Sequence, residues 1–382
     1  MIGIIGLFFY SFTQIDLGLT LSQWSIWQVA QKFFQNIGYF QRPLSSFIFV
    51  FIVLMLFSFY LLILWTVKRN NFTKKQAWFL IISTVVILTF SYNSFSYDLF
   101  NYIFDARIIT NYHQNPYLQK ALDYPYDPML SFMHWTHRTF PYGPVWLGLT
   151  VPLSFVGMQF FLPTFFIFKA LMSLSFLGTV FFIGKILRRV NPAAEVFGVV
   201  FFALNPLVIV ESLVSSHNDI AMIFFAIFAI YLIMNKKYIR SLIFLILSIG
   251  IKFASAFIFP VYLLIYFFEK KKKTANWEFV FSLITILMII PVILASYRTN
   301  FQPWYLLNVL PFAALVSRRY YFFIPSVVLS LVSLFQYLPF LYLGNWGKPV
   351  PSILLWMTIG SIILSIVLCC IWFTKLRLVT RR

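Results

Sequence analysis

The chain has 382 residues, of which 61% are hydrophobic and 10% are charged, and its formal net charge is +19. This balance excludes an ordinary water-soluble domain, and repeated apolar runs of about 20 residues indicate membrane-spanning helices. Because the bilayer core offers no water to backbone polar groups, we expect an all-α polytopic membrane protein, with 1–382 as a single unit.

The basic residues recur between the apolar runs instead of forming one continuous surface. Placing every basic cluster in the cytoplasm satisfies the positive-inside rule. The charge therefore predicts membrane topology, with membrane lipids as surroundings and no nucleic-acid partner. The clusters are at 68–75, 185–189, 236–240, 270–273, 318–319 and 375–382.

Taken in chain order, the apolar runs predict about twelve crossings that start from a cytoplasmic N-terminus. We expect N-terminal extra helices in 1–75, a core in 76–310 and C-terminal helices in 311–382. The apolar stretch 142–158 would invert all later helices if it crossed, so we predict a re-entrant or membrane-surface segment there. The runs are 3–18, 44–67, 76–95, 160–186, 194–212, 218–235, 239–251, 254–268, 277–297, 304–317, 320–342 and 350–374.

The run 76–95 leads into the longest predicted external loop, 96–141, which is rich in Tyr, Trp, His, Pro and Asp. Aromatic walls with a few polar groups are typical of a binding site for a polar ligand, and the alternative is an interfacial aromatic belt. If 98–110 is helical, Asp98 and Asp105 lie about two turns apart and project from similar faces.

Further polar residues fall on the same predicted face, and each has a structural alternative. The segment 217–219 joins two apolar runs, and Arg298, Trp304 and Tyr305 follow another. A single external His is more often structural than catalytic. Asp219 could cap the next helix, and Trp304 and Tyr305 could be interfacial anchors. Their shared placement on one face favours a common site.

Lys252 interrupts an apolar segment whose two ends are both cytoplasmic. Each arm has about 14 residues, too few to cross about 30 Å of hydrocarbon at about 1.5 Å per residue. Lys252 is therefore predicted at the tip of a hairpin, at membrane depth. A lysine there needs an anion or a water-filled cavity, so a functional role is expected.

Short motifs in this order resemble a known family. The loop contains DLFNY at 98–102, DAR at 105–107, NPY at 115–117, DP at 127–128 and PYGP at 141–144, and SHNDIAM at 216–222, the Lys252 segment and QPWYLL at 302–307 follow. Over about 96–310 the chain resembles the polyprenol-phosphate-mannose-dependent α-mannosyltransferases of actinobacterial lipomannan synthesis. It resembles the first mannosyltransferase of eukaryotic GPI-anchor synthesis more loosely. Both belong to the GT-C superfamily of membrane glycosyltransferases.

The resemblance implies a GT-C-type bundle of about 12 transmembrane helices with a long external catalytic loop. It implies transfer of a sugar, mannose, from a polyprenyl-phosphate-linked donor to a lipid or glycan acceptor, at the non-cytoplasmic face of the cell membrane. Carried over by position, it implies Asp98 as the loop acid. It also implies site roles for 217–219 and Lys252.

The residue types fit this chemistry. Asp98 is the expected general base, and further catalytic candidates are Asp105, His217 and Asp219. Asp105 is expected to orient groups or to form a salt bridge. Lys252 or Arg298 would bind the donor phosphate. Candidates for binding the sugar or the acceptor are Tyr102, Arg107, Tyr117, Tyr142, Asn218, Trp304 and Tyr305.

One base suffices if attack on the anomeric carbon inverts its configuration, whereas a retaining route would want a second carboxylate as nucleophile. The sequence contains no Asp-x-Asp pair, and no metal or other cofactor is expected. Two alternatives remain: a secondary transporter or flippase of lipid-linked oligosaccharides, and an oligosaccharide polymerase or ligase with a diphosphate-linked donor. Residue chemistry does not separate mannose from other sugars and does not name the acceptor.

Overall fold

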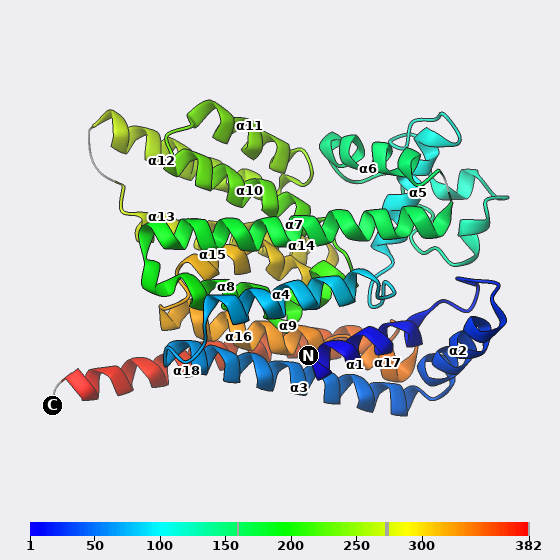
Figure 1. Ribbon diagram of the computed structural model, residues 1–382, viewed down its shortest axis with the longest axis horizontal. Coiled ribbons are helices and arrows are strands. Elements are labelled where there is room, and N and C mark those ends of the chain that lie inside the picture. Colours follow the sequence, from blue (N-terminus) through cyan, green and yellow to red (C-terminus); the bar gives the residue numbers. More distant parts are fainter. Residues whose placement is uncertain (159, 272–274, 381–382) are drawn as a thin grey trace.

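The computed structural model of the chain describes residues 1–158, 160–271 and 275–380. Within these ranges the secondary-structure elements are helices and no strand is present, which confirms the all-α prediction. The long helices run roughly side by side along one axis of the molecule (Figure 1). Lys272 and Lys273 of the predicted basic cluster at 270–273 lie outside the described residues, as do Arg381 and Arg382 of the cluster at 375–382.

The described residues contain five helical segments that are long and apolar enough to cross a membrane. A sixth arises if a bent pair of segments, Pro192–Ala203 and Pro206–Val214, forms one span with a 55° bend. The count of about twelve crossings is thus not confirmed. The five are α3 (Arg42–Lys68), α7 (Phe161–Val190), α13 (Trp277–Leu287) with α14 (Ile289–Thr299), α16 (Tyr320–Phe335) with α17 (Leu338–Leu343), and α18 (Val350–Thr380).

The remaining apolar runs fold into shorter helices, because hydrophobicity along a run does not report where a helix breaks. The predicted run 194–212 shows the cause. Pro206 has no backbone N–H to continue a helix, and Asn205 caps a new one by accepting the N–H of Leu207 at 3.0 Å. The shorter helices are α1 (Ile2–Ser11), α4 (Lys74–Thr89), α8 (Glu195–Ala203), α9 (Pro206–Ile209), α10 (Asp219–Met234), α11 (Tyr238–Ile249), α12 (Phe259–Lys270) and α15 (Leu310–Leu315).

One helix, α2 (Ser25–Gln35), has no counterpart among the predicted elements. Two of its polar side chains face inward: Gln31 donates to the Leu19 carbonyl at 2.6 Å, and Gln35 donates to the Asp16 carbonyl at 3.0 Å. Three of its apolar side chains face outward, since Ile26, Val29 and Phe33 are each more than 60% exposed. The segment was missed because it is too short and too polar to resemble a membrane span.

The predicted loop 96–141 contains α5 (Asp98–Thr110) and two short 3-10 turns, Ala121–Asp123 and Pro128–Ser131. It lies with α6 (Pro144–Val156) at one end of the bundle, whereas the C-terminus and the turn from α3 to α4 lie at the other (Figure 1). The 13 residues of α6 span about 20 Å, which is too short for a crossing. This length fits the prediction of a surface or re-entrant segment.

Candidate active site

Helix α5 carries Asp98 as its first residue, where a carboxylate interacts favourably with the positive end of the helix dipole. Ser96 Oγ accepts the Asp98 backbone N–H at 3.2 Å and so fixes the start of the helix. Leu99 and Phe100 are fully buried and hold α5 against the bundle. The helix over 98–110 is therefore present, and Asp98 and Asp105 lie about two turns apart on it, as expected for a helical segment.

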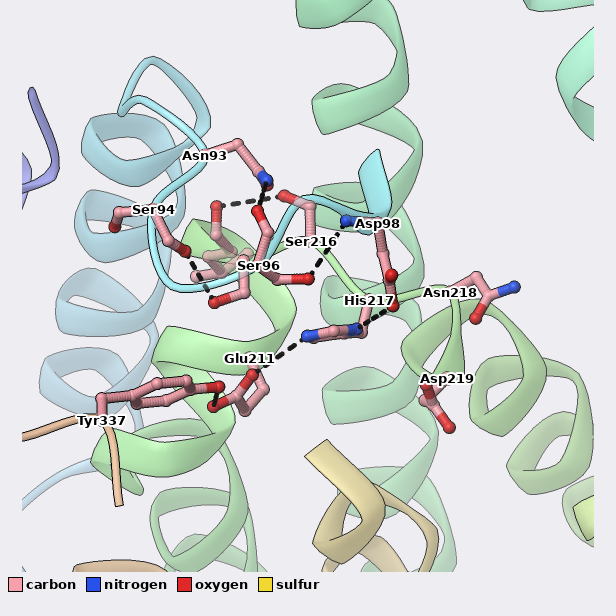
Figure 2. A network of polar contacts seen from close by, with 12 residues as sticks. Asn93, Ser94, Ser96, Asp98, Glu211, Ser216, His217, Asn218, Asp219 and Tyr337 are labelled. Carbon is pink, nitrogen blue, oxygen red and sulfur yellow. Dashed lines mark hydrogen bonds and ion pairs between the residues drawn. The ribbon is translucent and has the colours of Figure 1, made fainter. Parts of the chain in front are cut away.

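His217 lies in the turn between a π-helix, Val210–Val214, and α10. Its side chain is 0% exposed. The imidazole Nδ1 lies 3.4 Å from Asp98 Oδ2, and Nε2 lies 3.3 Å from Glu211 Oε2. The Tyr337 hydroxyl donates to Glu211 Oε1 at 2.9 Å. Figure 2 shows these groups in one row, with the imidazole between the two carboxylates.

In this row each charged group stabilises the charged form of its neighbour. Burial alone lowers the pKa of His217, but the two adjacent carboxylates outweigh it and raise that pKa to about 9. Burial alone raises the pKa of Asp98, but His217, Lys252 and Arg138 bring it below its ordinary value. At neutral pH His217 is therefore an imidazolium and Asp98 is ionised. Only the Asp98 end has some exposure, 14% of its side chain, against 0% for Glu211.

Trp304 covers one face of this row. Its ring stacks on the His217 ring with a centroid distance of 4.2 Å and an interplanar angle of 18°. Beside it, the Tyr305 hydroxyl lies 2.7 Å from Thr299 Oγ1. Trp304 thus contacts the proposed catalytic group directly and is more than an interfacial anchor.

Lys252 lies in the break between α11 and a 3-10 segment, Phe253–Ile258, as a residue between two short helices. Its Nζ lies 2.5 Å from Asp219 Oδ2, and its side chain is 21% exposed. Asp219 is the first residue of α10, but no side-chain capping bond is present at this helix start. Ion pairing with Lys252, and not helix capping, is therefore the contact that Asp219 makes.

Three more of the predicted residues join these groups. The Tyr102 hydroxyl donates to Asn218 Oδ1 at 3.2 Å, and the Tyr102 and Tyr142 rings meet edge to face at 5.3 Å. Lys252 Nζ lies 5.4 Å from the centre of the Tyr142 ring. Tyr142 and Trp304 thus add aromatic rings next to the charged groups of this region.

Other predicted residues lie apart from the row. Arg107 Nε pairs with Asp127 Oδ2 at 2.7 Å, and the Tyr112 hydroxyl donates to the same oxygen at 2.7 Å. This pair braces the segment after α5. Tyr117 is 41% exposed and donates to the Tyr142 carbonyl at 3.1 Å. Arg298 is exposed at the end of α14 and is not among the charges that act on Asp98.

Asp105 forms no ion pair among the described residues, so the expected salt bridge is not seen. Its side chain lies in a buried position, and burial raises its pKa to about 8, with Arg138 acting against that rise and Asp98 adding to it. Asp105 is therefore protonated at neutral pH. A protonated carboxyl can donate a hydrogen bond but is a poor base, which separates the roles of the two acids of α5.

Three residues of the site were not predicted from the sequence: Glu211, Tyr337 and Arg138. Glu211 had a usable signal: it is a carboxylate inside the otherwise apolar run 194–212, where an unpaired charge is costly. Tyr337 had none, because one tyrosine in an apolar run is ordinary. No group of three or more His, Cys, Asp or Glu residues in the described part of the chain is arranged to hold a metal ion.

Comparison with known proteins gives one match. Residues 1–267, more than half of the chain, match the family model described as alpha-(1->6)-mannopyranosyltransferase, N-terminal domain. No curated protein and no solved structure matches the chain. The matched segment includes Asp98, His217 and Lys252, and it agrees with the resemblance to lipomannan-type GT-C enzymes. The chain therefore belongs to the alpha-(1->6)-mannopyranosyltransferase family and is a membrane mannosyltransferase.

Proposed function

We propose that the chain transfers mannose from a polyprenyl-phosphate-linked donor to a hydroxyl of a lipid or glycan acceptor, with inversion at the anomeric carbon. In this proposal Asp98 is the general base and the reaction takes place at the non-cytoplasmic face of the cell membrane. The observation that carries the proposal is the row formed by Asp98, His217 and Glu211 beside the ion pair of Lys252 with Asp219.

Asp98 suits the role of base because it is the ionised, partly exposed end of the row. It would accept the proton of the acceptor hydroxyl while that oxygen attacks the anomeric carbon. The bond from the anomeric carbon to the phosphate oxygen breaks, and polyprenyl phosphate leaves with the electron pair. The imidazolium of His217 at 3.4 Å holds Asp98 ionised before the proton arrives.

The other carboxyl groups support inversion by their surroundings. Glu211 is buried behind His217, Asp219 is paired with Lys252, and Asp105 is protonated at neutral pH. None of them is a free carboxylate facing Asp98, as a covalent retaining route would want. A single displacement with one base is therefore the route that fits these residues.

Lys252 suits the donor phosphate. An ammonium group has three N–H donors, and Asp219 Oδ2 takes one of them at 2.5 Å. A phosphodiester linking one sugar to one lipid carries a single negative charge, and the two remaining N–H donors of Lys252 can bind its oxygens. A diphosphate carries more charge and would call for additional cations. These considerations favour the monophosphate donor over the diphosphate donor of a polymerase or ligase.

The proposal is tested with purified protein in lipid nanodiscs and mannose-labelled donors. Labelled polyprenyl-phosphate mannose is expected to pass its mannose to an acceptor glycolipid, with inverted configuration in the product. Polyprenyl-diphosphate mannose and nucleotide-linked mannose are expected to give no product. Transfer from the diphosphate at a similar rate would support the polymerase or ligase alternative, and movement of an intact lipid-linked sugar across proteoliposomes without transfer would support a flippase.

Replacing Lys252 by Met is expected to raise the donor KM about 10- to 100-fold, because a hydrogen bond to a charged group contributes about 1.5–3 kcal/mol. The acceptor KM should change little. Since Lys252→Met leaves Asp219 buried and unpaired, the control is the double variant with Asp219→Asn. The double variant should recover folded protein without recovering donor affinity. An unchanged donor KM in both variants would contradict a phosphate role for Lys252.

A further inference from the structure

Lys169 is a fully buried lysine in the first third of the candidate span α7, Phe161–Val190, and no part of the proposed chemistry uses it. Its ammonium donates to Ser91 Oγ at 3.0 Å, to the Leu213 carbonyl at 2.6 Å and to the Val214 carbonyl at 3.4 Å. All three acceptors are neutral. A lysine buried in a membrane helix is costly, so these contacts call for an explanation beyond packing.

The acceptors belong to the two segments that lead into the row. Ser91 follows α4 and begins the stretch that ends at Asp98, seven residues later. Leu213 and Val214 end the π-helix that precedes His217. Lys169 therefore binds two backbone carbonyls in the segment that leads to His217. It also binds the Ser91 side chain in the segment that leads to Asp98.

A second bond joins the same two segments. Ser215 Oγ donates to the Ser94 carbonyl at 3.0 Å, and within the first segment Asn93 donates to the Ser96 carbonyl at 2.6 Å. Figure 2 shows Asn93, Ser94 and Ser96 next to Ser216, on the side of the row where Asp98 lies. The contacts of Lys169 are thus part of a small polar joint between the two segments.

This joint has a physical task. The last carbonyls of a helix have no partners within it, and a buried carbonyl without a partner is unfavourable. Lys169 satisfies two of them and fixes their direction. A displacement of about 1 Å in a catalytic group can lower a rate about 10²-fold, so the contact of Asp98 with His217 depends on how firmly both segments are held.

We propose that Lys169 is a positioning residue for mannosyl transfer: by binding Ser91 and the end of the π-helix, it sets the distance between Asp98 and His217. The proposal rests on the proposed function, in which Asp98 is the base. It concerns geometry alone, since Lys169 does not touch the groups of the row.

The expected signature is a shift in pH dependence. The charged groups that act on Asp98 are His217, Lys252 and Arg138, and those that act on His217 are Asp98 and Glu211. If the joint loosens, the imidazolium moves away from Asp98, and the pKa of Asp98 rises. Activity should then fall with acidification at a higher pH than in the unchanged enzyme.

The experiment compares Lys169→Met with Lys185→Met in the full chain in nanodiscs. Lys185 is a matched control because it lies on the same helix, α7, and its ammonium lies 5.2 Å from the Phe181 ring, away from the row. Lys169→Met is expected to lower kcat about 10²-fold, to leave the donor KM nearly unchanged and to move the acid limb of kcat to higher pH. Lys185→Met should change none of these.

Ser215→Ala provides an independent arm, because it removes one bond of the joint and leaves the ammonium with its partners. It should move the acid limb of the pH dependence of kcat in the same direction, toward higher pH, by a smaller amount. If Lys169→Met does not fold, Ser91→Ala and Ser215→Ala decide the question. The proposal is overturned if both of these variants keep the kcat of the unchanged enzyme and the same pH dependence of kcat. It is also overturned if Lys169→Met yields less folded protein but the folded fraction keeps the pH dependence of the unchanged enzyme, since that result indicates a purely structural lysine.

Asp98→Asn, measured alongside, separates this proposal from the function on which it rests. If Asp98→Asn transfers mannose normally, Asp98 is not the base and both proposals are overturned. If Asp98→Asn is inactive but Lys169→Met matches Lys185→Met in kcat and in pH profile, only the positioning role is overturned.

Discussion

Replacing Asp98 by Asn is expected to lower kcat for mannosyl transfer by about 10²–10⁴-fold, the usual contribution of general base catalysis. Asn keeps the shape of the side chain and removes the proton acceptor. Donor binding should persist, because the ion pair of Lys252 with Asp219 does not involve Asp98. The measurement is single-turnover transfer from labelled donor, together with donor binding to the same nanodisc preparation.

The matched control is Asp105→Asn, two turns further along α5. Asp105 has a pKa raised to about 8 by burial, so it is already neutral at pH 7 and Asn resembles its working state. Its kcat is expected to fall less than about tenfold. A near-normal rate for Asp98→Asn with a verified donor and acceptor would move the search for the base to Asp219 or His217.

Replacing Glu211 by Gln is expected to destabilise the protein by about 3–5 kcal/mol, as found when one partner of a buried ion pair is removed. The imidazolium of His217 would lose one of its two carboxylates, and the Tyr337 hydroxyl would lose an ionised acceptor. Thermal unfolding in nanodiscs measures the effect. The control is Glu278→Gln, whose ion pair with Arg319 is about half exposed and should contribute at most about 1 kcal/mol.

The pH dependence of stability follows from the same contacts. The pKa of His217 is raised in the folded state to about 9 from its ordinary value of 6.5. The stabilisation is therefore fully present below pH 6.5 and is lost as the pH rises through 9. The melting temperature of the unchanged protein should fall across this window. In Glu211→Gln the fall should begin at lower pH and be smaller, and an identical profile in both proteins would contradict the ion-pair assignment.

The sequence predicted which polar residues lie together more accurately than it predicted the helices on which they lie. Asp98, 217–219 and Lys252 were placed on one face from charge and run length, and the structure brings them together. The twelve-crossing pattern is not confirmed, because apolar runs such as 194–212 conceal helix breaks.

Tertiary contacts explain what the sequence could not supply. The hydrogen bond of Tyr337 to Glu211 joins residues 126 positions apart in the chain, and no local sequence pattern predicts such a contact. The same holds for the ammonium of Lys169, whose acceptors lie 44 and 78 positions away. Asp105 and Arg107 lie two positions apart in one motif, yet Arg107 pairs with Asp127 and Asp105 stays protonated.

The contact between Tyr337 and Glu211 bears on how this enzyme can be divided. The family match ends at residue 267, but Trp304 and Tyr337, which stack on His217 and bind Glu211, come from beyond it. The two portions are therefore not interchangeable modules. A chimera whose second portion lacks counterparts of Trp304 and Tyr337 would expose one face of His217 and leave Glu211 without its hydroxyl partner, so recombination between such enzymes has to preserve both pairings together.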